Sequence, residues 1–230
     1  MSFFYYKSII LNFFIKYSKI TSAFFIFILV SLFAIWSHPS LIPKISPDGY
    51  GYWSIAKDFF TSISDASIRP WFFPLFLRVC MTISPDQWQV VLSLFQIFFH
   101  SITCVLIYFV FRKYSLKYFS ALVCTLIIGF NPNLISYTTY ILADSIFAVL
   151  TTFAWYYFLK INESSNWNFK SIVLASIFCA LSLLTKPVAL FLIFPFLFGI
   201  YLLKGFSYNF IKIAIFMIFI NFSMIILQWV

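Results

Sequence analysis

The chain has 230 residues, of which 63% are hydrophobic and only 9% are charged. A water-soluble domain carries about a quarter of its residues as charged side chains. This composition therefore excludes a soluble enzyme, a secreted disulfide scaffold and a disordered regulator. A mean hydropathy of +1.00 predicts instead that most of the chain lies in lipid, where helices of about 20 apolar residues span the hydrocarbon core. We therefore predict an all-α polytopic membrane protein.

Apolar runs separated by polar loops predict about seven transmembrane helices. The run at 118–130 is short for a full crossing, because a helix rises only about 1.5 Å per residue. The two runs that meet at Pro187 can also be interpreted as one kinked helix. We prefer a hairpin there, because a single helix would place Lys204 and Lys212 on the outer side. The predicted spans are residues 20–36, 88–111, 118–130, 134–159, 171–185, 187–203 and 213–230.

The net charge of +9 indicates membrane orientation and not nucleic-acid binding. Most of the basic residues fall in the N-terminal leader and in every second loop, which is the distribution expected of cytoplasmic segments. On the other side of the membrane, five basic residues face five acidic residues. We therefore expect membrane lipid but no nucleic acid as a partner. The cytoplasmic basic residues are Lys7, Lys16, Lys19, Arg112, Lys113, Lys117, Lys160, Lys170, Lys204 and Lys212.

Residues 37–87 form an external loop that is longer than a connector between two spans requires. Ser46 followed by Pro47 predicts a helix N-cap with proline at the first helical position. Apolar residues at helical spacing follow, which predicts an amphipathic juxtamembrane helix on the membrane surface. Asp48 would lie in its first turn, where the helix dipole favours the ionised carboxylate. The alternative is that Asp48 only caps this surface helix.

Two further features of the external loop indicate a ligand site. Gly49 and Gly51 lie next to Asp48, and we expect them to leave room for a ligand to approach the backbone. Arg69 precedes Pro70 and an apolar run, so its guanidinium would lie at the level of the lipid headgroups. Arginine is suited to bidentate binding of phosphate. The alternative is an arginine that extends to the interface without a ligand.

Two charged residues lie in or beside the later spans. Asp144 would lie about 15 Å along a helix that begins at Leu134, where inserting a carboxylate costs at least about 2.5 to 3.5 kcal/mol. Such a residue usually has a partner or a function, although a purely structural hydrogen-bonding role stays open. Lys186 lies at the outer turn between two spans, where it can contact a lipid phosphate or only extend to the interface.

Together these motifs resemble the N-terminal half of the GT-C membrane glycosyltransferases, in the branch that contains protein O-mannosyltransferases and lipid A aminoarabinose transferases. The resemblance rests on the order of the motifs along nearly the whole chain. Many relatives have a second acidic residue where this chain has Gly49, and their C-terminal part does not appear. Because the chain ends within an apolar run, we expect sequence beyond residue 230. The motifs are Pro47-Asp48-Gly49-Tyr50-Gly51-Tyr52-Trp53-Ser54-Ile55-Ala56, Arg69-Pro70 with Pro74, Asn131-Pro132-Asn133 with Tyr140 and Ala143-Asp144-Ser145, and Leu184-Thr185-Lys186-Pro187.

The resemblance implies transfer of a sugar from a polyprenyl-phosphate donor to a glycan, lipid or protein acceptor at the outer face of the membrane. Asp48 would be the base for the acceptor hydroxyl, while Arg69 and Lys186 would hold the donor phosphate. Asp144 would orient the acceptor or share a divalent metal with Asp48, and the sequence leaves both open. Aromatic residues that would contact the substrate, or else anchor the helices at the interface, are Tyr50, Tyr52, Trp53 and Tyr140.

The rival function is a non-catalytic lipid-glycan flippase or transporter subunit, in which Asp144 and Lys186 would line a substrate path. A purely structural membrane protein is a third alternative. The external helix with Asp48 favours the transferase, because a transporter site lies near the midplane of the membrane. The apolar composition and the uncleaved first helix indicate a bacterial inner membrane, with the active site on the periplasmic side.

Overall fold

A computed structural model describes residues 2–38, 40–59, 69–114, 116–161, 168–205 and 207–229. Within these ranges the regular structure is helical, with one isolated parallel bridge between Lys44 and Tyr140. The predicted all-helical fold class is therefore confirmed. The elements are α1 (Ser2–Trp36), α2 (Pro47–Lys57), α3 (Phe72–Ile83), α4 (Trp88–Lys113), α5 (Tyr118–Gly129), α6 (Pro132–Ser136), η2 (Tyr137–Thr139), α7 (Asp144–Ile161), α8 (Phe169–Thr185), η3 (Pro187–Leu192), α9 (Ile193–Lys204) and α10 (Tyr208–Trp229).

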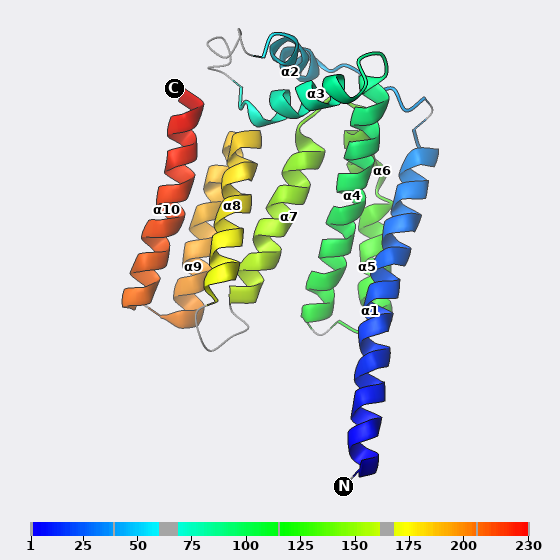
Figure 1. Ribbon diagram of the computed structural model, residues 1–230, viewed down its shortest axis with the longest axis vertical. Coiled ribbons are helices and arrows are strands. Elements are labelled where there is room, and N and C mark those ends of the chain that lie inside the picture. Colours follow the sequence, from blue (N-terminus) through cyan, green and yellow to red (C-terminus); the bar gives the residue numbers. More distant parts are fainter. Residues whose placement is uncertain are drawn as a thin grey trace.

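The long helices form a bundle, and two short helices lie across one end of it (Figure 1). Helix α8 packs on both α7 and α10, while α4 contacts α1, α5 and α7 and so joins the two halves of the bundle. Helices α2 and α3 lie across the end at which α1 ends and α7 begins (Figure 1). The chain reverses direction between α8 and α9, as the predicted hairpin at Pro187 requires.

By length and composition, two of the described helices can cross a membrane alone: Ser18–Trp36 within α1, and α4. A third crossing arises if α5 and the segment Pro132–Thr139, which meet at a bend of 48°, form one broken span. The described residues therefore support two or three spans, and the total of seven stays a prediction. The remaining apolar helices are shorter and comprise Phe72–Ile83, Phe169–Thr185, Pro187–Leu202 and Asn209–Ser223.

The predicted continuous helix over residues 134–159 is wrong. Helix α6 and the 3-10 turn η2 end before residue 140, and α7 begins only at Asp144. The hydroxyls of Ser136, Thr138 and Thr139 donate to backbone carbonyls three residues earlier, at 2.6, 2.7 and 2.8 Å. Such bonds compete with the helical ladder and favour a tighter turn. Asp144 therefore lies at a helix N-terminus and not in the middle of a span.

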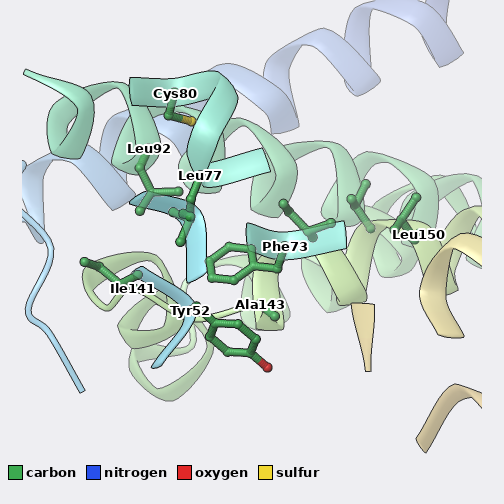
Figure 2. Close-up of a cluster of buried hydrophobic side chains, with 11 residues drawn as sticks. Tyr52, Phe73, Leu77, Cys80, Leu92, Ile141, Ala143 and Leu150 are labelled. Carbon is green, nitrogen blue, oxygen red and sulfur yellow. The ribbon is translucent and has the colours of Figure 1, made fainter. Parts of the chain in front are cut away.

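A buried apolar cluster fixes the two short helices to the bundle (Figure 2). In α3, Phe73, Leu77 and Cys80 repeat at helical spacing and are fully buried, which is typical of the core-facing stripe of an amphipathic helix. Phe73 packs edge-on against the ring of Tyr52, with 4.9 Å between the ring centroids. Figure 2 shows the hydroxyl of Tyr52 pointing out of the cluster. The cluster comprises Tyr52, Ala56, Phe73, Leu77, Cys80, Leu92, Ile141, Ala143, Ile146, Val149 and Leu150.

Candidate active site

Asp48 lies in the first turn of α2, as predicted from its neighbours. The side chain of Ser46 accepts a hydrogen bond from the backbone N–H of Gly49 at 2.9 Å, and Pro47 occupies the first helical position. The predicted N-cap is therefore confirmed. The side chain of Asp48 is 69% exposed, so its carboxylate is open to solvent beside the end of the bundle.

Arg69 lies against Asp48 through two hydrogen bonds. Its Nη2 is 3.0 Å from Oδ1 of Asp48, and its Nη1 donates to the backbone carbonyl of the same residue at 3.3 Å. The guanidinium also lies over the ring of Tyr52, at 4.9 Å from the centroid. Solvent-exposed ion pairs contribute only about 0 to 1 kcal/mol. The carboxylate of Asp48 can therefore be exchanged for another anion at low cost.

Two glycines allow the close contacts around this pair. A Cβ on Gly49 would lie 2.5 Å from the carbonyl oxygen of Ile141, and a Cβ on Gly51 would lie 2.7 Å from Nε of Arg69. The predicted room for a ligand beside these glycines is thus filled by the protein itself. The backbone of Lys44 also bonds the segment before α7, since it accepts from the N–H of Ile141 at 3.0 Å. Helix α2 is therefore held next to the N-terminus of α7.

Asp144 and Lys186 form a second and less exposed ion pair. Nζ of Lys186 lies 2.6 Å from Oδ1 of Asp144, and the two side chains are 30% and 25% exposed. Asp144 occupies the first turn of α7, and Lys186 directly follows the last residue of α8. Each charge therefore has the sign that the dipole of its own helix favours. Removing one member of a shielded pair is more harmful than removing one member of an exposed pair, because the other charge is left without compensation.

The two ion pairs lie within electrostatic reach of one side chain, Tyr52. Burial raises the pKa of Tyr52, and the positive charges of Arg69 and Lys186 oppose that rise. The fold thus brings together two carboxylates and two cations that are widely separated in sequence. The formal charges of the four side chains cancel.

The aromatic residues predicted to contact the substrate differ in the solvent exposure of their rings. The ring of Trp53 stacks on Trp88, with centroids 6.3 Å apart and 18° between the planes, and Nζ of Lys57 lies 3.6 Å from the Trp53 ring centroid. Tyr52 is 8% exposed, whereas Tyr50 is 60% exposed. The ring of Tyr50 is therefore the most accessible of the three for a sugar.

Two buried polar residues that the sequence analysis did not assign to the site hold the segment before α7. Nε2 of Gln96 donates to the carbonyls of Tyr140 and Leu142, at 3.0 and 3.1 Å. Nε2 of His38 bonds the carbonyl of Thr138 at 3.1 Å. A polar side chain such as Gln96 inside an apolar run is the signal that could have identified this role, since it needs a partner in lipid.

Asp144 also lines a cavity of about 240 Å³ between α4, α5 and α7. The wall is largely apolar, and it extends from the N-terminal end of α7 along α4. A ligand in this cavity would therefore lie beside Asp144. The lining residues are His100, Thr103, Cys104, Ile107, Ile128, Leu134, Tyr137, Asp144, Ser145 and Ala148.

Carboxylates for a metal ion would have to come from Asp48 and Asp144, each of which lies against a cation. In the described part of the chain, no group of three or more His, Cys, Asp or Glu side chains could hold a metal ion. In each aspartate, the cation contacts Oδ1, so an ion shared by the two carboxylates would compete with Arg69 and Lys186 for these groups.

Comparison with protein families identifies the family to which this chain belongs. Residues 76–230 match the family model of the dolichyl-phosphate-mannose-protein mannosyltransferases. The match covers more than half of the chain, so the protein belongs to this family, which is one of the GT-C families. Comparisons with curated proteins and with solved structures found no match. The matched part contains Tyr140, Asp144 and Lys186, whereas Asp48 and Arg69 precede it.

Proposed function

We propose that the protein is a glycosyltransferase that moves a sugar from a polyprenyl-phosphate donor to an acceptor at the outer face of the membrane. Membership of the mannosyltransferase family supports a lipid-linked sugar donor. The observation that carries the proposal is the convergence of the pairs Asp48–Arg69 and Asp144–Lys186 around Tyr52. A site for transfer from a lipid phosphate needs both a base and cations, and these four residues supply them.

The reaction forms a bond between the acceptor hydroxyl oxygen and the anomeric carbon of the sugar. The bond between that carbon and the phosphate oxygen breaks, and its electron pair leaves with the lipid phosphate. Asp48 takes the proton of the hydroxyl, which makes it the general base. Arg69 and Lys186 stabilise the charge on the departing phosphate. Because Asp48 is exposed and its pair with Arg69 is weak, the donor phosphate can replace it at the guanidinium and leave the carboxylate available.

Asp144 has a different role in this proposal. It keeps Lys186 in place through their 2.6 Å contact and also lines the 240 Å³ cavity. We therefore assign it to the orientation of the acceptor. The aromatic residue assigned to the sugar is Tyr50, on the strength of its exposed ring, and Tyr52 is assigned to holding Arg69.

The proposal includes seven membrane crossings with the basic loops in the cytoplasm. Helix α4 ends in Arg112 and Lys113, and α7 carries Lys160 in its last turn, both at the end of the bundle opposite α2 and α3 (Figure 1). This distribution supports a cytoplasmic location for that end by the positive-inside rule. Helices α2 and α3 then lie on the outer face, which in a bacterial inner membrane is the periplasmic side.

A transfer assay with purified protein in liposomes tests the proposal. A panel of polyprenyl-phosphate sugars is supplied with candidate glycan, lipid and peptide acceptors, and products are identified by mass spectrometry. We expect a glycosylated acceptor with at least one donor, and loss of the product in Asp48→Asn. Movement of the donor between leaflets without any glycosylated product would instead favour the flippase.

A further inference from the structure

Segment 138–142, which comprises the end of η2 and the irregular residues before α7, is held at the outer end of the bundle by donors from other elements. Its carbonyls accept from the ring of His38, from the backbone of Lys44 and, at two positions, from the amide of Gln96. A carbonyl oxygen can only accept, so Nε2 of His38 carries the proton in this contact. Irregular backbone at membrane depth is tolerated only where protein groups form hydrogen bonds with its carbonyl and N–H groups. This need for hydrogen-bond partners gives the donors a structural role.

Gln96 also has an unpaired side-chain oxygen, which its hydrogen bonds to backbone carbonyls do not explain. Its side chain is fully buried in α4, and its Oε1 has no hydrogen-bond partner among the described residues. An unpaired buried acceptor destabilises the folded state. Burial of Oε1 of Gln96 therefore lowers the stability of the folded protein. The favourable contribution of this side chain comes from its two hydrogen bonds to the carbonyls of Tyr140 and Leu142.

These two bonds lie on either side of Ile141, where α2 meets the bundle. The carbonyl of Ile141 lies under Gly49, so closely that a Cβ there would be 2.5 Å away. Asp48 is the neighbour of Gly49, and Asp144 begins α7 two residues after Leu142. The amide of Gln96 thus holds the part of segment 138–142 that lies between α2 and the start of α7.

We propose that Gln96 is a positioning residue that sets the placement of Asp48 relative to Asp144 through segment 138–142. The inference rests on the proposed function, since it assigns the two carboxylates to one reaction. Among the described residues, Gln96 bonds the backbone of segment 138–142 and neither Arg69 nor Lys186, so its loss should disturb the placement of the base more than the binding of phosphate by the two cations. The transfer step is therefore more sensitive to Gln96 than donor binding is.

The test compares Gln96→Met with Ser93→Ala in the full chain in liposomes. Methionine has a similar length but no amide, and Ser93 is a matched control: it is fully buried one turn earlier in α4, and its hydroxyl has no partner among the described residues. We expect Gln96→Met to lower kcat by roughly 10²-fold, as small misplacements of reacting groups do, with the donor KM little changed. Ser93→Ala should leave both constants near those of the wild type.

Hydrogen exchange provides a readout that does not depend on activity. Peptides covering residues 138–142 should exchange faster in Gln96→Met and at the wild-type rate in Ser93→Ala. If Gln96→Met does not accumulate, Gln96→Asn replaces it, because its shorter amide cannot hold both carbonyls. Unchanged exchange, or a raised donor KM with unchanged kcat, would overturn the positioning role. Absence of transfer by the wild type would count against the proposed function, while the exchange comparison would still decide whether Gln96 holds the segment.

Discussion

Arg69 occupies the space that a side chain at Gly51 would need. A Cβ at position 51 would lie 2.7 Å from Nε and 2.9 Å from Cζ of Arg69. The guanidinium thus lies against the backbone of α2, within reach of the carboxylate and the carbonyl of Asp48. Glycine at position 51 is needed here for the close approach of a side chain and not for an unusual backbone conformation.

The first prediction is that Gly51→Ala displaces Arg69 without unfolding α2. The atoms in the way are the end of a flexible side chain, so the guanidinium can move. We expect the thermal stability to change little and donor binding to weaken by roughly ten-fold, equivalent to about 1.4 kcal/mol. Gly49→Ala is the contrasting variant, because its Cβ would meet the backbone oxygen of Ile141 at 2.5 Å. It should lower the thermal stability, and equal behaviour of the two variants would contradict this interpretation.

The second prediction concerns Asp48 as the base. Asp48→Asn keeps the size of the side chain but removes its basicity, so sugar transfer should fall by roughly 10² to 10⁴. The protein should still insert into the membrane, because the side chain is exposed. Asp86→Asn changes another exposed carboxylate between α1 and α4 and should retain activity. Transfer by Asp48→Asn within a few-fold of the wild type would remove Asp48 from the mechanism.

The third prediction is that Arg69 and Lys186 bind one phosphate. Arg69→Ala and Lys186→Ala should each weaken donor binding, and the double variant should lose less than the sum of the two effects, as coupled residues do. Arg69→Lys should also weaken binding, because it keeps the charge but loses the bidentate geometry. Donor affinity is measured by titration in liposomes. Unchanged affinity in Lys186→Ala beside a clear loss in Arg69→Ala would leave Arg69 as the only phosphate ligand.

Lys186 needs a second comparison, because its removal also leaves Asp144 without its partner. Asp144→Asn combined with Lys186→Met removes both charges of the shielded pair. We expect this double variant to be more thermally stable than Lys186→Met alone, since an uncompensated charge is more harmful than an absent pair. If the double variant is instead the less stable one, the contact of 2.6 Å does not govern the stability of this region.

The fourth prediction concerns topology. Asp86 is exposed between α3 and α4, and Asn133 is exposed at the start of α6. Cysteines introduced at these two positions should react with a membrane-impermeant maleimide added from outside. Cysteines at Lys117 and Lys170, at the opposite end of the bundle, should be protected until the membrane is opened. Labelling of Lys170→Cys from outside while Lys117→Cys stays protected would contradict the seven-span arrangement.

Local signals in the sequence predicted much of the fold. Ser46 and Pro47 identified the start of α2, because N-capping depends on neighbouring residues alone. The apolar run that leads to Arg112 and Lys113 located α4 to within two residues of its observed end. The break before Asp144 was missed, because residues 134–159 contain neither glycine nor proline and are apolar enough overall to resemble one helix. Besides the local hydroxyls of Ser136, Thr138 and Thr139, the groups that stabilise this break come from distant parts of the chain: His38, Lys44 and Gln96.

The candidate site was predicted as a set of residues but not as a set of contacts. The resemblance brought Asp48, Arg69, Asp144 and Lys186 together, yet it assigned both cations to phosphate. In the structure each cation lies against a carboxylate, 21 residues away for Arg69 and 42 for Lys186. Ion pairs between remote residues depend on how helices pack, and periodicity carries no information about that.

The stack of Trp53 on Trp88 allows the position of α2 against the bundle to be followed by the absorption of the two indoles. One indole belongs to α2 and the other to α4, and their planes are 18° from parallel. Closely stacked indoles couple their electronic transitions, so the near-ultraviolet circular dichroism depends on their separation. A displacement of α2 from the bundle would weaken that coupled signal, and it could be followed in the unlabelled protein while a donor lipid is added.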